Sequence, residues 1–464
     1  MSPSDSSYEV RVRGVRKYKG VRGTTYTVRW RVSGRDFQRT FATAKLADSF
    51  RSELLVAARE GHGFDPGGGL PKSLAKERHG PTWYEHTMDF VEAKWPHAAP
   101  RHRKGLAEAL ATVTFALTAP SDDAPSPDEV RRALFRWSFN VGARQTEMPD
   151  EFWEALTWVE RQSLPLFEVQ RAVNIRKALD SLSLKLDGSA AAASTVMRKR
   201  SAFYSALQYA VELELIESNP LDRISWKAPA ATGAVDRRVV VNPSQARALL
   251  AAVRELSPAV EGFFACLYFA GLRPSEAVNL REKDCLLPES GWGELVLIGS
   301  HQTTGRAWTD SGDAGEERGL KHRSRQDTRH VPAHPELVAV LRRHLDRFPL
   351  GPDARLFVAR TGKRGVPLPP PYSNPLSMGT AYRVWHKARA AALTPGQAAS
   401  PLARRPYDLR HACLSTWLNA GVPATQVSEW AGHSVNVLLK VYAKCVDGQD
   451  EAAKTRIEQA LRTD

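Results

Sequence analysis

Hydrophobic and polar positions alternate along residues 10–41, and this pattern predicts a small antiparallel β-sheet. The segment is rich in Val, Thr and aromatic residues, and a Ser-Gly pair within it is typical of a turn. Residues 44–58 then take the spacing of an amphipathic helix that could pack on one face of the sheet. Its apolar positions are Ala47, Phe50 and Leu54. We therefore expect residues 1–62 to form a small antiparallel sheet plus a helix.

Two segments rich in Gly, Pro and Ala predict linkers, residues 63–80 and residues 228–237. Between them, residues 81–227 show amphipathic helical spacing in successive stretches, so we expect an all-helical second domain. Residues 238–464 combine helical spacing with strand-like runs and predict an α+β domain that ends in a helical tail. Its first helix should begin near Pro243, where Asn242 could cap it. The expected fold is multidomain, mainly α with small β-sheets.

The charge balance points to a polyanionic partner. The chain has 65 Lys and Arg against 51 Asp and Glu, a net charge of +14. Residues 1–62 alone contain 13 basic and six acidic side chains, and this difference of seven is half of the net charge of the chain. Nucleic acid is the leading candidate for such a partner, although many basic proteins bind none.

Other classes of protein are disfavoured by composition. No apolar run approaches the roughly 20 residues of a membrane span, and the polar N-terminus lacks the apolar stretch of a secretory signal. We therefore expect a protein that stays in the cytoplasm of the cell that makes it. The four cysteines show no metal-ligand spacing, so we expect no metal, and we interpret them as packing residues. They are Cys266, Cys285, Cys413 and Cys445.

Four motifs of the last domain carry side chains suited to phosphodiester chemistry. They are AGLRPSEA with Arg273, LKHRSRQDTRHVP with Lys321, RPYDLRH with Tyr407 and Arg410, and EWAGHSVNVLLKVYAKC with His433 and Tyr442. In order and spacing, residues 240–445 resemble the tyrosine recombinases of the phage integrase type. The resemblance implies a site-specific recombinase that cleaves and rejoins DNA through a 3′-phosphotyrosyl link, without metal, ATP or other cofactor.

The chemistry explains why these residue types belong together. Phosphoryl transfer places extra charge on the non-bridging oxygens, and the planar guanidiniums of Arg273 and Arg410 can each donate a fork of hydrogen bonds to them. Tyr442 is expected to be the nucleophile, with His433 as its proton acceptor or as a phosphate donor. The resemblance gives Lys321 the role of general acid for the departing 5′ oxygen. Glu276 is best interpreted as a partner that orients Arg273.

Two features depart from the family pattern. Tyr407 stands where the commoner H-x-x-R motif has a histidine, which leaves an acid/base role at that position in doubt and makes Tyr407 a rival nucleophile. Tyr442 is favoured because it follows His433 by nine residues, as the family spacing requires. Lys321 lies eleven residues before Pro332, farther than in many relatives.

Each residue also has a structural interpretation. Arg273 could simply pair with Glu276 at a helix start, either tyrosine could be a packing residue, and His411 is interpreted as structural. Lys321 could be one more phosphate contact among its neighbours, which are Arg323, Arg325 and Arg329. Taken together, the ordered set favours the recombinase.

The resemblance also suggests roles for the other two domains. The N-terminal sheet of residues 1–62, with Arg29 and Arg31, resembles an arm-type DNA-binding module, which implies a three-stranded sheet plus a helix. A small oligomerisation module is the alternative. Residues 81–227 take the place of the family's helical core-binding (SAM-like) domain. Its candidate DNA contacts are Arg198, Lys199 and Arg200, although a solvated charge run is nearly as good an interpretation.

The expected function is integration and excision of a mobile element by a homotetramer acting on double-stranded DNA attachment sites. The resemblance implies an excisionase and a DNA-bending protein as further partners. Resolution of chromosome or plasmid dimers is the main alternative, and a type IB topoisomerase or a repressor with a decayed site is disfavoured. The DNA target cannot be derived from the sequence.

Overall fold

The computed structural model divides the chain into two compact units, Met1–Pro229 and Ala230–Asp464. It describes residues 7–20, 23–71, 80–227, 235–320, 327–362 and 365–442, with positions 454, 455, 457–459 and 461 near the C-terminus. The division falls within the second predicted linker. The predicted boundary between residues 1–62 and 81–227 lies inside the first unit and stays a prediction.

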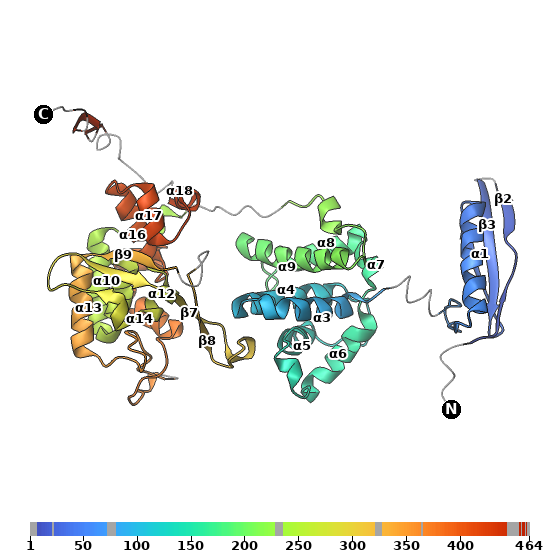
Figure 1. Cartoon of the computed structure of the whole chain (residues 1–464), viewed down its shortest axis with the longest axis horizontal. Coiled ribbons are helices and arrows are strands. Elements are labelled where there is room, and N and C mark those ends of the chain that lie inside the picture. The colour runs from blue at the N-terminus through green and yellow to red at the C-terminus, as the bar shows by residue number, and fades with distance from the viewer. Residues whose placement is uncertain are drawn as a thin grey trace. The chain divides into compact units, whose positions relative to one another are not determined.

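The N-terminal sheet has four described strands, all antiparallel (Figure 1). They are β1 (Val10–Val12), β2 (Arg16–Gly20), β3 (Gly23–Val32) and β4 (Arg35–Phe41). β1 and β2 pair with successive parts of one edge of β3, and residues 13–15 between them stand opposite only Val28 and Arg29. This β-bulge separates β1 from β2, so the sheet has four described strands. The prediction of a three-stranded sheet was therefore wrong.

Helix α1 (Ala44–Arg59) covers one face of this sheet. Alternate residues of β3 point to opposite faces, so Val28, Trp30 and Val32 are buried while Arg29 and Arg31 are exposed. On the helix the buried positions are Ala47, Phe50, Leu54 and Ala57, which confirms the predicted apolar face. The sheet therefore presents arginines on the face away from α1.

The segment after α1 corrects the first predicted linker. Phe64 is fully buried and its backbone pairs with that of Ser7, and Trp30 donates its indole N–H to the carbonyl of Gly69. Asp65 holds the turn between these contacts by accepting hydrogen bonds from the backbone of Gly67 and Gly68. Residues 64–71 thus pack on the sheet, and the prediction of a linker beginning at residue 63 was wrong there. Residues 72–79 lie outside the described residues.

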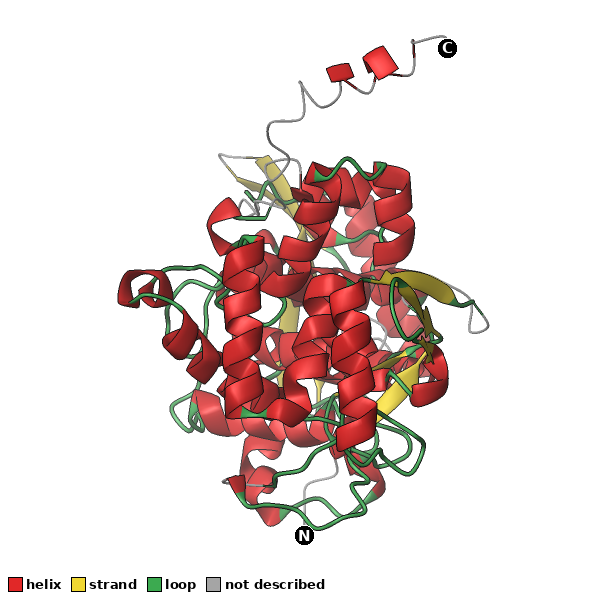
Figure 2. Ribbon diagram, turned by 90° about the vertical axis from the view of Figure 1, so that its left-hand side faces the viewer, coloured by secondary structure: helices red, strands yellow, loops and turns green. Residues whose placement is uncertain are grey.

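The rest of the first unit is built from helices, which Figure 2 shows in red. They are α3 (Trp83–Lys94), α4 (Pro100–Ala116), α5 (Pro127–Ala133), a π-helical turn (Leu134–Ser138), α6 (Asp150–Gln162), α7 (Leu166–Val169), α8 (Ala172–Leu182) and α9 (Ala193–Glu212). Short 3₁₀ turns are Trp95–His97, Ala143–Gln145 and Pro220–Arg223. At the centre of this helical core the rings of Trp83 and Phe203 meet edge to face, with 5.4 Å between centroids.

The second unit begins with a helical core. Its first helices are α10 (Pro243–Leu256), α11 (Glu261–Phe269) and α12 (Pro274–Asn279), followed later by α13 (Pro335–Arg347), α14 (Met378–Ala392) and α15 (Pro395–Ala399). Short 3₁₀ turns are Arg237–Val239, Pro258–Val260, Glu282–Asp284 and Arg306–Trp308. Asn242 caps α10 by accepting the backbone N–H of Gln245 at 2.9 Å, as predicted. Every residue of α11 is buried, so this helix forms the centre of the unit.

Two small sheets accompany these helices. β5 (Cys285–Leu286), β6 (Gly293–Leu297) and β9 (Arg329–Ala333) form an antiparallel sheet, while β7 (Ser300–Thr303) and β8 (Gly315–Arg318) form a hairpin. The prediction that this domain contains strands among its helices is confirmed. Lys321 follows β8 and lies outside the described residues, as does Cys445.

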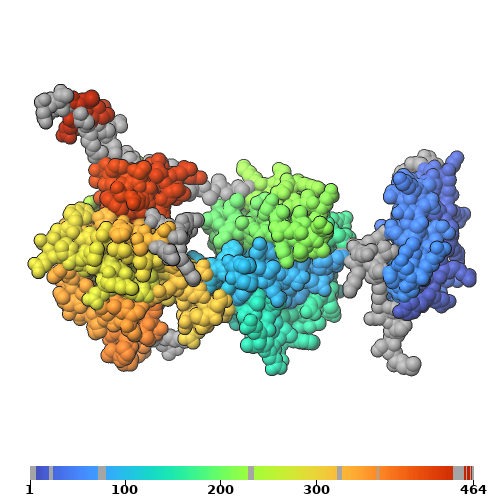
Figure 3. All heavy atoms as spheres, in the orientation of Figure 1, coloured from blue at the N-terminus to red at the C-terminus, as the bar shows by residue number. Residues whose placement is uncertain are grey.

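Three helices complete the second unit: α16 (Asp408–Asn419), α17 (Ala424–Ala431) and α18 (Val435–Tyr442). In Figure 3 the red atoms of this region form a continuous layer on the yellow and orange body of the unit. The N–H of Val235 donates to the carbonyl of Val441 at 2.8 Å, which ties the beginning of the unit to α18. Of the predicted tail helix, only positions 454, 455, 457–459 and 461 are described, all of them helical. Across the described residues, no helix is long and apolar enough to span a membrane.

Candidate active site

A buried carboxylate organises two arginines at the start of α12. Arg273 is the residue before the helix, and its Nη1 lies 2.7 Å from Oε1 of Glu276, whose Oε2 accepts the backbone N–H of Arg273 at 2.9 Å. Arg329 reaches the same carboxylate from β9 with two hydrogen bonds of 3.0 and 2.6 Å. Glu276 and Arg329 are each 2 % exposed. Glu276 is therefore placed to hold Arg273.

The charge state of Glu276 follows from these neighbours. Burial by itself would raise the pKa of this carboxyl group, but the guanidiniums of Arg329, Arg273 and Arg410 outweigh it and lower the pKa to about 2. The carboxylate is therefore ionised at neutral pH. Because three guanidiniums face one carboxylate, the cluster keeps an excess of positive charge.

Arg410 occupies the centre of the site and is 0 % exposed. Its guanidinium donates to the backbone carbonyl of Gly271, to that of Ala431 at 2.6 Å, and to Nε2 of His433 at 3.0 Å. One side chain on α16 thus connects the turn before α12 with the end of α17. The directional fork that these bonds need is available to arginine and not to lysine.

Gly432 ends α17 in the left-handed conformation, with φ +62°. Its carbonyl accepts a hydrogen bond of 2.6 Å from Nη2 of Arg273. A Cβ at this position would overlap Nη1 of Arg329 and would lie 3.2 Å from Nη1 of Arg273. A glycine is therefore required both by the backbone conformation and by the close approach of two guanidiniums, and it sets the place of His433.

Three buried polar atoms in the cluster lack partners within the part of the chain that the structure describes. They are Nε of Arg329, Nε of Arg410 and Nδ1 of His433. Burial and the guanidiniums of Arg410 and Arg273 lower the pKa of His433 to about 3, so its imidazole is neutral. Unsatisfied buried donors beside an excess of positive charge are well suited to an anion. A phosphate group has the charge and the acceptor oxygens to fill this place.

Tyr442, the predicted nucleophile, contacts the residue next to Arg410 but is buried. Tyr442 is 1 % exposed and belongs to an apolar cluster formed by α16, α17 and α18. Its phenolic oxygen lies 2.9 Å from Nδ1 of His411, the residue after Arg410. His411 was interpreted as structural from the sequence. The structure instead gives it a contact with the expected reacting atom.

Tyr407 lies at the start of α16 and packs its ring edge to face against the ring of His411, with 5.0 Å between centroids. The two rivals for the role of nucleophile thus both contact one imidazole. Sequence analysis also missed Arg329, which it grouped with the surface phosphate contacts. The only available signal was its position in a predicted strand, because its partner Glu276 is 53 residues away.

The DNA-binding candidates of the first unit differ from one another. Arg31 is paired with Asp36 through bonds of 3.0 and 2.6 Å, while Arg29 lies on the same exposed face opposite Gln38. Lys199 is only 8 % exposed and lies 3.3 Å from Glu108, so its charge is turned inward.

The two arginines beside Lys199 are also engaged. Arg198 shares Glu108 at 3.5 Å and lines a pocket of about 410 Å³ with Lys94, Arg101 and His102. Arg200 lies over the ring of Trp226, 5.6 Å from its centroid. Of these three adjacent cations, two therefore pair with Glu108 and the third lies over an aromatic ring.

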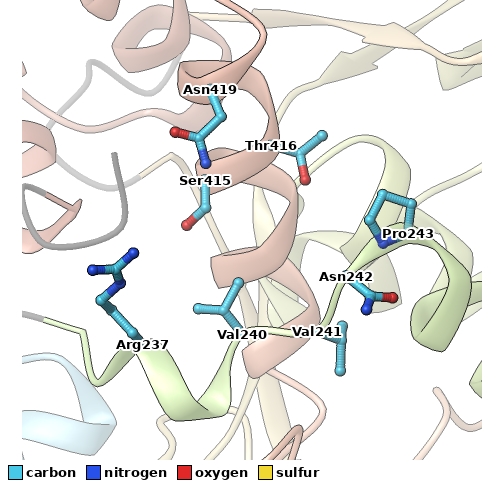
Figure 4. A pocket seen from close by; sticks show the side chains of 8 residues that line it. All are labelled: Arg237, Val240, Val241, Asn242, Pro243, Ser415, Thr416 and Asn419. Atoms are coloured by element: carbon cyan, nitrogen blue, oxygen red, sulfur yellow. The ribbon is translucent and has the colours of Figure 1, made fainter. Parts of the chain in front are cut away.

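A further pocket of about 290 Å³ opens beside α16 (Figure 4). Its lining residues are Arg237, Val240, Val241, Asn242, Pro243, Ser415, Thr416 and Asn419, none of which belongs to the cluster described above. Within the described ranges, no group of three or more His, Cys, Asp or Glu side chains is placed to hold a metal ion.

Comparison with known proteins gives one family match. Residues 240–447 match the model of the phage integrase family. No curated protein matches the chain.

Among solved structures, the integrase of the transposon Tn1549 in complex with a circular intermediate DNA is 16% identical, covers 69% of this chain and 92% of its own, and has a TM-score of 0.44. The XerH recombinase bound to its difH substrate is 13% identical, with 78% and 97% coverage and a TM-score of 0.40. The catalytic domain of bacteriophage HP1 integrase is 18% identical, with 49% and 99% coverage and a TM-score of 0.29.

Proposed function

We propose that the chain is a tyrosine recombinase of the phage integrase family, whose model matches residues 240–447, and that it cleaves and rejoins DNA to integrate and excise a mobile element. In this proposal Tyr442 attacks a DNA phosphate and forms a 3′-phosphotyrosyl link. The link conserves the energy of the phosphodiester, so rejoining needs no ATP. A homotetramer on two double-stranded attachment sites, an excisionase and a DNA-bending protein complete the proposal.

The observation that carries this proposal is the convergence of Arg273, Arg410 and His433 on one buried, positively charged place. The hydrogen bonds of the DNA-free site leave Nε of Arg410 and Nδ1 of His433 without partners among the described residues, as a phosphate site requires. A donor fixed in advance toward the developing charge typically contributes about 10²- to 10³-fold in rate. Glu276 and Arg329 serve as positioning residues.

Three further residues complete the proposed chemistry. Lys321 protonates the departing 5′ oxygen, a role taken from the family pattern. Tyr407 stands at the position of the family histidine and contributes to the site beside His411. Because Tyr442 is 1 % exposed and Arg410 is 0 % exposed, we expect DNA binding to shift α17 and α18 so that the phosphate reaches both side chains.

The N-terminal sheet supports integration over dimer resolution. Its face away from α1 carries Arg11, Arg29 and Arg31 among Thr and Gln side chains, which are suited to phosphates and base edges. We propose that this face binds outlying arm sites, and that the basic pocket beside Arg198 takes core-site phosphate. Deleting residues 1–79 should abolish binding to arm sites and leave cleavage at the core site, as measured by gel shift and by cleavage assay.

The decisive experiment uses a nicked suicide substrate that carries the attachment site. The wild-type protein should form a covalent protein–DNA product without metal or ATP, Tyr442→Phe should form none, and Tyr407→Phe should still form it. A covalent product with Tyr442→Phe but none with Tyr407→Phe would reverse the assignment of the nucleophile. Tight binding without any covalent product in the wild type would support a repressor with a decayed site.

A further inference from the structure

His411 and Tyr442 form a hydrogen-bonded pair inside the second unit. Nδ1 of His411 and the phenolic oxygen of Tyr442 are 2.9 Å apart, and Tyr442 is buried in an apolar cluster that includes Leu414 and Leu438. A phenolic O–H buried in such surroundings needs a polar partner. The imidazole meets this need with a group that can also take a proton.

The two imidazoles of the site hold their protons differently. A guanidinium can only donate, so the contact between Nη2 of Arg410 and Nε2 of His433 makes Nε2 the acceptor. The neutral ring of His433 then carries its hydrogen on Nδ1, which suits a phosphate donor. The lone pair on Nε2 of His433 already accepts a hydrogen bond from Arg410. His433 is therefore not available to accept the proton of the tyrosine.

We infer that His411 is the residue that accepts the proton of Tyr442 during strand cleavage, an assignment that rests on the proposed role of Tyr442 as nucleophile. The phenolic O–H bond breaks and its proton moves to Nδ1 of His411, while the electron pair of the oxygen forms the bond to phosphorus. The bond from phosphorus to the 5′ oxygen breaks, and that oxygen takes a proton from a separate acid. On rejoining, His411 returns the proton to Tyr442.

The surroundings of His411 are consistent with this role. Burial and the guanidiniums of Arg405 and Arg410 lower its pKa to about 4, so the imidazole is neutral and has a lone pair at neutral pH. The negative charge that develops on phosphorus offsets the charge of the imidazolium once it forms. The ring of Tyr407 packs against the imidazole and restricts its rotation. Tyr407 is thereby a positioning residue for His411.

A substitution of His411 can show whether this residue only holds the phenol by a hydrogen bond or also accepts its proton. His411→Asn places an amide oxygen near the site of Nδ1, which can accept the hydrogen bond but not the proton. We expect covalent-complex formation on the suicide substrate to slow by about 10²- to 10⁴-fold at neutral pH, with unchanged DNA affinity. The variant's rate should then rise about tenfold per pH unit up to the pKa of the phenol, a dependence that the wild type lacks.

Two chemical changes, one in Tyr442 and one in the DNA substrate, test whether His411 or another group transfers each proton. A fluorinated tyrosine at position 442, with a more acidic phenol, should restore much of the rate of His411→Asn at neutral pH. A substrate with sulfur in place of the 5′ oxygen has a leaving group that needs no acid, so it should restore Lys321→Ala but not His411→Asn. His344 provides the matched control, because it is a buried histidine whose Nε2 contacts the carbonyl of Leu356 at 2.9 Å. His344→Asn should leave the pH profile unchanged.

The outcomes are distinguishable. If His411→Asn cleaves at the wild-type rate or faster, or is slow at every pH without rescue by the fluorinated tyrosine, His411 only holds the phenol and the inference is overturned. If Tyr442→Phe still forms the covalent product, the proposed nucleophile itself is wrong. If Tyr442→Phe forms no covalent product while His411→Asn cleaves at the wild-type rate, the role of His411 is rejected and Tyr442 remains the proposed nucleophile.

Discussion

The two halves of the candidate site are built on different principles. The phosphate half is a charged network in which Glu276, Arg273, Arg329 and Arg410 are cross-linked by short hydrogen bonds from four separate segments. The nucleophile half is an apolar cluster of α16, α17 and α18 in which Tyr442 is covered. Arg410 in the first half and Tyr442 in the second are both covered, at 0 % and 1 % exposed, so a shift of α17 and α18 must open both halves. Arg273 and Arg410 also donate to carbonyls at the end of α17, so the two halves share this helix end.

The largest effect should come from the carboxylate at the centre of the charged half. Glu276→Gln leaves Arg329 buried without its charge partner, and loss of one member of a buried pair typically costs about 3–5 kcal/mol. Urea denaturation at pH 7 measures this loss of unfolding free energy. Glu336→Gln, which alters an exposed pair with Arg247, is the control and should cost less than about 1 kcal/mol.

The same variant has a pH signature. The pKa of Glu276 is about 2 in the folded chain and about 4.3 in the unfolded chain. The ionised carboxylate therefore stabilises the fold fully when the pH is above the pKa of the unfolded chain. This stabilisation is lost as the pH falls toward about 2. The difference in unfolding free energy between wild type and Glu276→Gln should therefore shrink between these pH values. A constant difference would show that the charge of Glu276 does not matter.

A substitution of Arg410 tests the same half through its chemistry. Arg410→Lys keeps the charge but cannot reach the carbonyls of Gly271 and Ala431 and His433 together. We expect covalent-complex formation on the suicide substrate to fall about 10²- to 10³-fold. Arg247→Lys, a change at the exposed pair, should leave the rate unaltered. An equal rate in Arg410→Lys would mean that charge alone suffices.

The smallest effect should come from the connection between the halves. Gly432→Ala forces a Cβ into a left-handed position against Arg329, which should cost about 1–3 kcal/mol of stability and slow cleavage by moving His433. Gly396→Ala on α15 is the control, because a Cβ there meets nothing within 4 Å. Thermal unfolding of both variants measures the difference. Equal melting temperatures would show that the backbone can shift without strain.

The sequence predicted what depends on local spacing. The buried face of α1, the Asn242 cap and the division of the last domain into helices and strands follow from periodicity and cap chemistry, which are properties of neighbouring residues. Arg329 was misjudged because nothing near it reveals a carboxylate 53 residues away. His411 was missed because its partner Tyr442 lies on another helix. The packing of Phe64 on the sheet was hidden by the glycines that follow it.

The hydrogen bond from Val235 to Val441 connects the described beginning of the second unit to the helix that carries Tyr442. Val441 is the residue immediately before Tyr442, so the place of the phenol depends on this backbone contact as well as on the apolar cluster around it. We therefore expect a shift of Val235 to loosen Tyr442 without moving the arginines of the charged half. Loss of this contact would then leave the arginines in place and still change how readily Tyr442 reaches DNA.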